Sequence, residues 1–478
     1  MIQDGQGPAG RSDSHLAPIN GTDDVHPKQE PTRVSEIPHL PARHETYYIE
    51  SPSGGARHTH DLFRFPAKFH APVVGWALEN FGRDGAAVLD PFNGSGTVQV
   101  EAVARAMCSV GIDVDPLACF VARAKTTPLP PKELRLGLRR IEAIVRPFKR
   151  SGTELEELRG TDISDQDFER QTQDLSFPDI PNMFHWFSRY VVVDLARLFW
   201  AIGEASVDKQ HEHFFRACAA AIIRRASNAD PAPVSGLEVT RIQAERNAKR
   251  VIPVLDLFVA KATKALEGMQ SLWDVRQKHQ SAVTTKVLRG DTAKARQVLA
   301  NAQVDWAFPL VVTSPPYCMA VQYSRRHKLE MYWLGLVECQ VQHLELARTY
   351  IGRPRVRMSD WDGCGEFGIR DLDLTVIKIM ERNPAKARAL KHYFWSMSEV
   401  FAEISQIMPS RGKMICAIGD SVCCGVPVTT SRFFTELAAQ QFTLENHFSY
   451  TVRNRHMQYP LRQGAGIGRE HILVLART

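Results

Sequence analysis

Apolar and polar positions along the chain alternate between short strand-like runs and longer helix-like runs. Residues 69–81 place apolar side chains at helical spacing after a proline, which predicts a short helix. Residues 88–116 then contain an apolar strand, a glycine turn, a helix and a second strand that ends in acidic residues. The alternation resumes over residues 284–317 with a strand, a helix and another apolar strand. Strands separated by helices in this way predict an α/β fold, with a parallel sheet and helices on both of its faces.

Two stretches interrupt the alternation and divide the chain into predicted units. Residues 126–283 carry long helical patterns joined by proline-rich loops, which predicts an inserted, mainly helical domain. Residues 336–390 form a second, mixed insert, and residues 1–45 are rich in Gly, Pro, Ser, Asp and His, as in a flexible arm. The catalytic domain is predicted to combine the remaining segments, which are residues 46–125, 284–335 and 391–478.

Composition limits the classes of protein to which the chain belongs. With 478 residues, of which 44% are hydrophobic and 23% charged, the sequence is that of a globular protein with a sizeable core. No run approaches the roughly 18 apolar residues that a membrane helix needs, and the polar N-terminal segment lacks the apolar stretch of a signal peptide. Nine cysteines without a C-x-x-C pair suit a reducing compartment. A cytoplasmic protein is therefore expected.

Neither the cysteines nor the histidines predict a metal site. His211, Glu212 and His213 lack the i, i+4 spacing that points two imidazoles to one side of a helix, so no metal is assigned. The formal net charge of +6 and the isoelectric point near 8.8 suit a polyanionic partner, because cationic side chains near phosphates release counterions. Charge by itself does not separate DNA-binding proteins from other basic enzymes.

The first motif that carries chemistry lies in the first strand–turn–helix segment. Gly94 and Gly96 follow the strand directly, where residues without a Cβ let the backbone approach a ligand closely. Asp90 precedes this turn, and Asp113 and Asp291 end the next two predicted strands. Ligands of open α/β sheets bind beyond the carboxyl ends of the strands, so these residues are predicted to face one crevice. Alternatively, the two later aspartates cap the helices that follow them, and the glycines form an ordinary tight turn.

The second motif is Thr313-Ser314-Pro315-Pro316-Tyr317, at the end of a predicted apolar strand. The two prolines exclude a helix and remove two N–H donors, so backbone carbonyls stay free to accept hydrogen bonds. The serine adds a hydroxyl acceptor and the tyrosine an aromatic face. These groups suit an amino group on a flat ring, whose lone pair they would direct toward a methyl donor for in-line displacement. A base inside a duplex must be flipped out to reach such a pocket. The alternative is a proline turn that merely ends a strand.

Together, D-P-F-N-G-S-G-T at residues 90–97 and T-S-P-P-Y at residues 313–317 resemble the motifs of the amino-directed DNA methyltransferases. The resemblance implies a Rossmann-like class I methyltransferase fold and S-adenosylmethionine as cofactor. It places the loop at residues 90–97 near the methionine part, Asp113 at the ribose hydroxyls and Asp291 at the adenine. The segment R-F-P-A-K-F-H-A-P at residues 64–72 is similar, more loosely, to a further cofactor motif of the family.

The residue before P-P-Y bears on the target base. Adenine-directed members of the family usually carry Asp or Asn there, whereas Ser is typical of the cytosine-N4 enzymes, so the resemblance favours cytosine-N4. The catalytic residues that it implies are Ser314, Pro315, Pro316 and Tyr317. The cofactor-binding residues that it implies are Lys68, Phe69, His70, Asp90, Pro91, Phe92, Gly94, Ser95, Gly96, Thr97, Asp113, Asp291 and Thr313.

The resemblance leaves the two inserts unmatched, and the chain ends on the last predicted strand. Recognition of DNA is therefore expected from an insert, whose arginines would contact phosphates or guanine edges. Basic side chains just after the T-S-P-P-Y segment, here called the catalytic loop, and in the T-V-R-N-R segment are further candidates for DNA contact. In each case the alternative is a solvated charged face. The residues predicted to bind DNA are Arg241, Arg246, Arg250, Tyr323, Arg325, Arg353, Arg355, Arg453 and Arg455.

The leading hypothesis is a site-specific DNA methyltransferase that acts on cytosine-N4 of a flipped-out base, in a restriction–modification or defence setting. DNA is then the expected partner, with a cognate restriction endonuclease or defence protein as a further candidate. Three alternatives remain: an adenine-N6 DNA methyltransferase, an RNA base methyltransferase and a non-catalytic DNA-binding subunit. Enzymes that methylate guanine-N2 of tRNA share D-P-F-x-G-S-G-T, but they normally carry Asp before P-P-Y and an N-terminal RNA-binding module, for which residues 1–60 are too short and polar.

Overall fold

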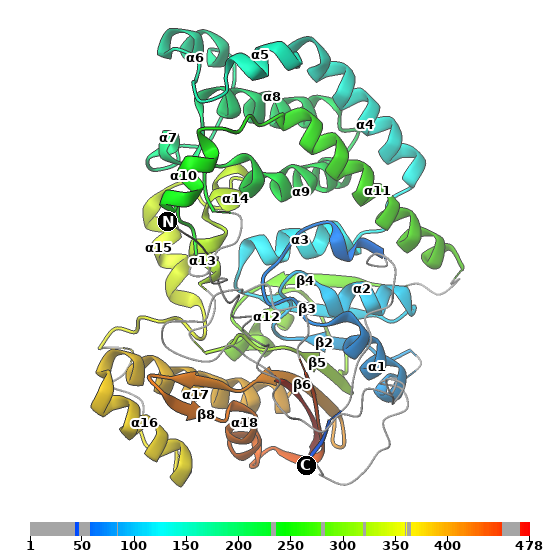
Figure 1. Ribbon diagram of the computed structural model, residues 1–478. Coiled ribbons are helices and arrows are strands. Elements are labelled where there is room, and N and C mark those ends of the chain that lie inside the picture. The colour runs from blue at the N-terminus through cyan, green and yellow to red at the C-terminus, as the bar shows by residue number, and fades with distance from the viewer. Residues whose placement is uncertain are drawn as a thin grey trace, which may run out of the picture.

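An eight-stranded sheet with helices on both faces forms the centre of the molecule, and a layer of further helices packs beyond one face (Figure 1). The computed structural model describes residues 44–46, 58–83, 85–230, 236–278, 283–318, 322–358, 360, 365–451 and 469–478. The strands are β1 (His44–Thr46), β2 (Val88–Asp90), β3 (Ser109–Asp113), β4 (Thr285–Arg289), β5 (Leu310–Thr313), β6 (Lys413–Gly419), β7 (Ser421–Cys423), β8 (Val426–Val428), β9 (Phe442–Thr451) and β10 (Arg469–Arg477).

The helices belong to three groups along the chain. Those before the first insert are η2 (His58–Asp61), α1 (Ala71–Phe81), α2 (Thr97–Ala104) and α3 (Pro116–Thr126). Those of the first insert are α4 (Pro131–Val145), η3 (Arg146–Phe148), α5 (Gly152–Glu157), α6 (Asp165–Thr172), α7 (Met183–Trp186), α8 (Arg189–Ala205), α9 (Lys209–Ala226), α10 (Arg241–Asn247) and α11 (Val254–Lys278). The later ones are η4 (Thr292–Lys294), α12 (Ala295–Asn301), α13 (Tyr323–Arg326), α14 (Lys328–Trp333), α15 (Gln340–Thr349), α16 (Arg370–Arg382), α17 (Pro384–Ser405) and α18 (Thr430–Ala438).

The strand order in the sheet is β1-β9-β10-β6-β5-β2-β3-β4. Strands β4, β3, β2, β5 and β6 run parallel to their neighbours, and β10 lies antiparallel between β6 and β9. From β2 the chain first builds the sheet outward through β3 and β4, and then returns to build the other side through β5 and β6. This topology confirms the predicted Rossmann-like α/β sheet.

Alternate residues of the buried strands pack against different helix layers. Leu310 and Val312 of β5 lie in one core with α1 and α2, whereas Val311 between them lies in another core with α12, α17 and α18. This division follows from strand geometry, because successive side chains point to opposite faces. Both faces are therefore buried, as the uniformly apolar strands predicted.

The first insert forms a helical layer with its own apolar core, seen above the sheet in Figure 1. Helices α4, α8, α9 and α11 supply most of this core, and α3 of the sheet layer packs against it. Helix α14, which follows the catalytic loop in the sequence, also contributes to it. The Trp333 ring lies 5.5 Å from the Phe199 ring in a stacked arrangement, so Trp333 is a core residue. The region after the catalytic loop thus joins the sheet to the helical layer.

The glycine turn between β2 and α2 contains two glycines with different roles. Gly96 has a φ of 76°, and a Cβ there would lie 2.8 Å from the Cβ of Ala122 in α3. Gly96 therefore lets α2 and α3 approach each other, rather than opening space for a ligand as the sequence suggested. Gly94 has a φ of 49° and no such neighbour.

We predict that Gly96→Ala lowers the free energy of unfolding more than Gly85→Ala does. Both glycines have φ near 75°, but a Cβ at Gly85 would have no atom within 4 Å. The Gly85 variant therefore reports the left-handed backbone cost, about 1–2 kcal/mol, and the Gly96 variant adds an overpacking cost of about 1–3 kcal/mol. Urea unfolding followed by circular dichroism measures both. Equal losses in the two variants would contradict the packing role.

Candidate functional site

Residues of both sequence motifs come together in one pocket at the carboxyl ends of β2, β3 and β5. The pocket lies between β2 and β5. The connection after β2 leads toward β3, and the connection after β5 leads the opposite way, toward β6. Open α/β sheets bind ligands at such a point. It encloses ≈ 830 Å³ of empty space, part of it open to solvent. The predicted catalytic and cofactor-binding residues that line it are Lys68, Phe69, Asp90, Phe92, Gly94, Ser95, Thr97, Asp113, Asp291, Ser314 and Pro316. The predicted residues that do not line it are His70, Pro91, Gly96, Thr313, Pro315 and Tyr317.

Asp113 shapes the glycine loop and does not cap a helix. Its Oδ2 accepts a hydrogen bond from the Gly94 amide at 2.7 Å, and its Oδ1 accepts one from the Asp115 amide at 2.9 Å. Helix α3 is capped instead by Asp115, whose Oδ1 accepts from the amides of Leu117 and Ala118. A Cβ at Gly94 would have no atom nearer than 3.9 Å, so the pocket stays open beside it. Asp113 therefore holds the loop in its open conformation.

A hydrogen bond joins the two sequence motifs. The Thr313 hydroxyl at the end of β5 donates to Asp90 Oδ1 over 2.8 Å, and the Phe92 amide donates to the same oxygen over 3.1 Å. Ser314 follows Thr313 directly and lines the pocket wall. Segments that lie 223 residues apart in the sequence are thus fixed side by side.

The pocket floor gathers buried acidic side chains. Burial raises the pKa of Asp90 to about 7 and that of Asp113 to about 7, and the neighbouring acids add to both effects. Burial also raises the pKa of Asp115. Such a cluster stabilises a positively charged ligand, because a cation offsets the cost of keeping the carboxylates ionised.

Asp291 has both of the roles that the sequence left open. It caps the short helix η4, because its Oδ1 accepts a hydrogen bond from the Ala293 amide at 3.0 Å. It is also exposed at the rim of the pocket. The adjacent Thr292 hydroxyl donates to the Pro91 carbonyl, which ties this segment to the glycine loop.

The catalytic loop ends in a carboxylate contact that the sequence did not predict. The Tyr317 hydroxyl donates to Glu470 Oε1 over 2.5 Å, and the Tyr450 hydroxyl donates to the other oxygen of the same carboxylate. Burial, together with the negative charge of Glu470, raises the pKa of Tyr317 well above its usual value. Glu470 is the second residue of β10 and lies 153 residues after Tyr317, so no local motif indicates this pairing. The contact fixes the orientation of the Tyr317 ring.

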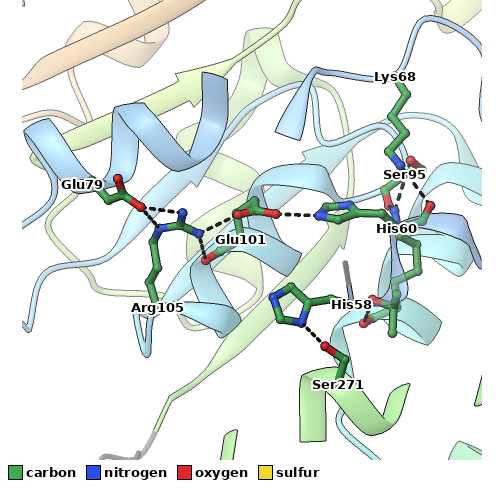
Figure 2. A network of polar contacts seen from close by, with 10 residues as sticks. His58, His60, Lys68, Glu79, Ser95, Glu101, Arg105 and Ser271 are labelled. Atoms are coloured by element: carbon green, nitrogen blue, oxygen red, sulfur yellow. Dashed lines mark hydrogen bonds and ion pairs between the residues drawn. The ribbon is translucent and has the colours of Figure 1, made fainter. Parts of the chain in front are cut away.

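A buried lysine supports the glycine loop. Lys125, at the C-terminal end of α3, is 0% exposed, and its Nζ donates to the Ser95 carbonyl over 2.6 Å. Burial lowers the pKa of Lys125 well below its usual value. Lys68, which lines the pocket, donates to the His60 carbonyl over 3.0 Å (Figure 2). The sequence offered no signal for Lys125, because its neighbours form an ordinary amphipathic helix.

The same region contains a chain of polar contacts, one hydrogen bond and two ion pairs, that links α1, α2 and η2 (Figure 2). His60 contacts Glu101 at 2.6 Å, Glu101 contacts Arg105 at 2.5 Å, and Arg105 contacts Glu79 at 2.7 Å. Burial lowers the pKa of His60 to about 4, so the ring is neutral at pH 7 and donates a hydrogen bond to Glu101. The network anchors the segment that carries Lys68 to the helix that follows the glycine loop.

Tyr323, which the sequence assigns to DNA contact, lies in the wall of the pocket. Its ring is stacked between Phe65, at 5.8 Å between centroids, and Tyr350, at 6.5 Å. Burial raises the pKa of Tyr323. The three rings form an aromatic wall that the sequence did not predict, and this position does not support a DNA contact by Tyr323.

Some of the predicted DNA-binding arginines are held by the protein itself. Arg250 donates to the Ser227 carbonyl over 2.7 Å, and its burial lowers its pKa. Arg353 pairs with Asp360 at 2.6 Å and has only 14% of its side chain exposed. Arg241 differs, because 93% of its side chain is exposed.

The other predicted arginines are exposed or lie beyond the described residues. Arg246 and Arg355 are exposed, and Arg325 is partly exposed and pairs with a glutamate at 3.3 Å. Arg453 and Arg455 lie outside the described residues. Across the described ranges, no helix is long and apolar enough to span a bilayer, and no group of three or more His, Cys, Asp or Glu side chains is placed to hold a metal ion.

The pocket fits the cofactor that the resemblance implies. Open space beside Gly94 admits a ligand close to the backbone, and the buried carboxylates of Asp90 and Asp113 suit its positive charge. The aromatic wall offers flat surfaces beside which an adenine ring fits. These features match a cationic nucleoside such as S-adenosylmethionine.

Known relatives are Type II methyltransferases. M.MvaI of Kocuria varians is 26% identical over 377 residues, which cover 77% of this chain and 78% of that protein. M.BsoBI of Geobacillus stearothermophilus is 24% identical over 307 residues, which cover 60% of this chain and 55% of that protein, so the chain spans about half of this relative's length. No family model matches the chain. These relatives support a methyltransferase and imply S-adenosylmethionine as the methyl donor.

Among solved structures, the chain is similar to the rRNA methyltransferase aviRa from Streptomyces viridochromogenes. The identity is 12%, the TM-score is 0.29, and the match covers 87% of this chain and 88% of that one. A similarity at this level carries no argument about this protein.

We predict that Lys125→Met weakens binding of S-adenosylhomocysteine by about tenfold. The substitution keeps the length of the side chain but removes the N–H donor to the Ser95 carbonyl, a hydrogen bond worth about 0.5–1.5 kcal/mol. Without it the glycine loop loses its fixed position. Isothermal titration calorimetry measures the affinity, and the exposed Lys132→Met serves as control. Unchanged affinity in the Lys125 variant would show that the loop does not depend on this contact.

We predict that affinity for S-adenosylmethionine rises as the pH increases from about 6 to about 8. Asp90 and Asp113 have pKa values of about 7 in the folded protein, so both become more negative across this interval and attract the cation more strongly. Their contribution to folding has the opposite sign. The folded state binds these protons more tightly than the unfolded state, so that contribution is present at low pH and is lost as pH rises from the ordinary 3.8 through about 7.

Calorimetry at several pH values tests this profile, with two variants to assign it. Asp113→Asn should reduce the pH dependence of the dissociation constant. Asp194→Asn is the matched control, because burial also raises the pKa of Asp194, to about 6, but it lies in the helical insert. A flat wild-type profile would mean that these carboxylates do not meet the cation.

Proposed function

We propose that the protein is a site-specific DNA methyltransferase that transfers a methyl group from S-adenosylmethionine to N4 of cytosine. The observation that carries the proposal is the hydrogen bond between Thr313 and Asp90, because it brings Ser314 into the same pocket as Gly94 and Asp113. A pocket built in this way gives the methyl donor and the acceptor loop a common space. The relatives are named Type II methyltransferases, a designation that suggests a restriction–modification setting.

Residues of the catalytic loop supply the acceptor side of the reaction. S-adenosylmethionine, when bound, supplies an electrophilic methyl group on a sulfonium. Among the described residues, none makes a hydrogen bond to the Ser314 hydroxyl, which therefore has an acceptor available for the exocyclic amino group. A carbonyl of the proline pair accepts the second N–H of that group. With both N–H bonds held by Ser314 and the proline carbonyl, the lone pair of the amino nitrogen would face the methyl group that the cofactor supplies. The nitrogen would release one of its two protons toward its hydrogen-bond acceptor as the methyl group leaves the sulfonium, so positioning by the loop would suffice without a covalent intermediate.

Tyr317 completes the proposed base pocket. A flipped base stacks on an aromatic ring whose orientation is fixed, because a fixed ring loses little freedom when the base arrives. Glu470 accepts hydrogen bonds from the Tyr317 and Tyr450 hydroxyls, so the Tyr317 hydroxyl is held in place next to the pocket-lining Pro316. Cytosine is favoured over adenine because Ser precedes P-P-Y, which is the typical arrangement of the cytosine-N4 enzymes.

Helix α10, which carries exposed arginines, lies beside the helices that follow the S-P-P-Y loop in the sequence (Figure 1). Arg325 of α13 pairs with Glu238 just before α10, and Arg224 of α9 donates to the Arg326 carbonyl over 3.3 Å. The first insert and the catalytic region are therefore joined at this edge. Arg246 is exposed there, and so is Arg241, which pairs with Glu245 of its own helix at 3.2 Å; we propose this edge as the DNA-binding surface.

Expression in a methylation-free bacterial host tests the function directly. We expect N4-methylcytosine at one recurrent sequence motif in the genomic DNA, detected by single-molecule sequencing and by mass spectrometry of nucleosides. Ser314→Ala should reduce methyl transfer at least tenfold, because the amino group loses one of its two anchors, while the affinity for S-adenosylmethionine stays within about twofold. Calorimetry and a radiolabelled methyl-transfer assay measure the two quantities.

Ser206→Ala, at the C-cap of α8, is the matched control, because this hydroxyl donates only to the Ile202 carbonyl of the preceding helix. N6-methyladenine in place of N4-methylcytosine would keep the mechanism and overturn the choice of base. A Ser314 variant with normal transfer would assign the acceptor to another group. If no modified DNA base appears although the cofactor binds, RNA substrates or a non-catalytic DNA-binding role would replace the proposal.

A further inference from the structure

Helix α4 exposes a row of basic side chains on the outer face of the helical layer. Six basic and two acidic residues lie between Pro131 and Lys149. The exposed basic side chains of α4 and η3 are Lys132, Arg135, Arg139, Arg140 and Arg146. Four of them recur after three, four and seven positions, which places them on one side of the helix. The opposite side is apolar and packs into the core of the insert through Leu134, Leu138 and Ile141.

Most of this row has no partner within the protein. The side chains that make neither an ion pair nor a hydrogen bond in the described ranges are Lys132, Arg139, Arg140 and Arg146. Arg135 contacts the neutral amide oxygen of Gln270 at 3.1 Å. Of the two acidic residues, Glu133 contacts His211 at 3.4 Å, and Glu142 makes no ion pair in the described part of the chain. The positive charge of the row is therefore uncompensated.

Several exposed arginines elsewhere on the molecule are paired within their own helices. Arg170 pairs with Asp167 and Arg432 with Glu436, three and four residues away, at 2.6 and 2.7 Å. On α4, by contrast, basic residues follow one another at three and four positions, where like charges repel. A polyanion that lies along this face would relieve the repulsion without displacing an internal ion pair.

The row is held in a fixed place by aromatic contacts at its C-terminal end. The Phe148 ring of η3 meets the Trp200 ring of α8 edge to face at 6.5 Å, and the Arg197 guanidinium lies 4.8 Å from the Phe148 ring centroid. The apolar side of α4 is buried as well, so the basic side chains project from a rigid support. Figure 1 shows α4 and α10 at opposite sides of the helical layer, so this face is separate from the proposed α10 edge.

Charge and spacing favour the phosphate backbone of duplex DNA as the partner of this face. Helix geometry spreads the row from Lys132 to Arg146 over about 21 Å. Duplex DNA carries a phosphate about every 3.4 Å along each strand, so a helix that lies against the duplex can give each cation a phosphate. A bilayer suits the face less, because the apolar side that would enter the lipid is already occupied by the core. Contacts to phosphates do not depend on the DNA sequence.

We propose that the outer face of α4 is a second DNA-binding surface, which contacts the phosphates of a duplex segment other than the one at the pocket. The choice of DNA rests on the proposed function, and the surface goes beyond it. A chain with two such surfaces stays bound to one segment of duplex while the pocket approaches another.

The salt dependence of DNA binding tests the surface. Fluorescence anisotropy of a labelled duplex of about 30 base pairs and arbitrary sequence gives the dissociation constant of the full chain at several salt concentrations. The α4 variant combines Lys132→Gln, Arg139→Gln and Arg146→Gln. Each lost phosphate contact reduces the slope of log K against log salt by about 0.9. We expect the slope to become shallower by about two to three units, and binding at about 0.1 M salt to weaken about tenfold or more.

A charge-matched variant separates a local contact from a change in net charge. Its substitutions, Arg159→Gln, Arg170→Gln and Arg432→Gln, remove exposed arginines that pair with acidic residues three or four positions away. It has the same net charge as the α4 variant, but its slope should stay within about one unit of the wild-type slope. Arg139→Lys with Arg146→Lys keeps the charge of the row and should bind as the wild type does. Circular dichroism and titration with S-adenosylhomocysteine check the fold of each variant.

The outcomes distinguish the surface from the function itself. An unchanged slope in the α4 variant, or an equal change in both Gln variants, would overturn the surface. Weaker binding to an RNA duplex or to anionic phospholipid vesicles, with DNA binding unaltered, would assign the face to another partner and would also overturn it. The methyltransferase proposal survives these results if N4-methylcytosine appears in the host DNA. If neither DNA binding nor a modified base is detected, the proposed function fails and the surface fails with it.

Discussion

The pairing of β2 with β5 is the constraint on which the site depends. Val88 and Leu89 of β2 lie opposite Leu310 and Val311 of β5, in parallel register, although the helical insert separates the two strands in the sequence. Because the strands are parallel, their carboxyl ends meet at the same edge of the sheet. The glycine loop and the S-P-P-Y loop therefore begin side by side, and the contact between Thr313 and Asp90 fixes their spacing.

Hydrogen bonds from buried polar side chains hold the loops around this edge. Asp113 holds Gly94 from one strand end, and Lys125 holds the Ser95 carbonyl from the end of α3. Burying such groups costs free energy unless hydrogen bonds compensate, and here each cost is partly offset by a backbone partner. The arrangement keeps a short glycine-rich loop in one conformation before any ligand binds. A preorganised loop of this kind supports positioning, which is what a methyl transfer without a covalent intermediate requires.

The inserts contribute more to the pocket than a recognition role would require. The first insert packs its core against α3, so the helix that carries Lys125 is fixed from both sides. The second insert brings Tyr350 to the pocket wall, where it stacks with Tyr323. The arginines that the sequence predicts to bind DNA differ in their surroundings. Arg250 and Arg353 are bound by other parts of the protein, whereas Arg241 is exposed. The proposed cofactor pocket and the proposed DNA-binding surface thus share structural elements.

The sequence by itself determined the α/β sheet, the glycine turn after β2 and the proline-stiffened turn after β5. Each is encoded locally, by apolar runs that bury both faces of a strand or by glycines and prolines that restrict the backbone. Only the tertiary structure decided which residues meet across long separations. Glu470, Lys125 and Tyr350 have no local signature, because their roles come from partners that are distant in the chain. Gly96 was misread for the same reason, since its neighbour Ala122 belongs to the next helix. Side-chain pairing depends on packing geometry, which a pattern of residue types does not contain.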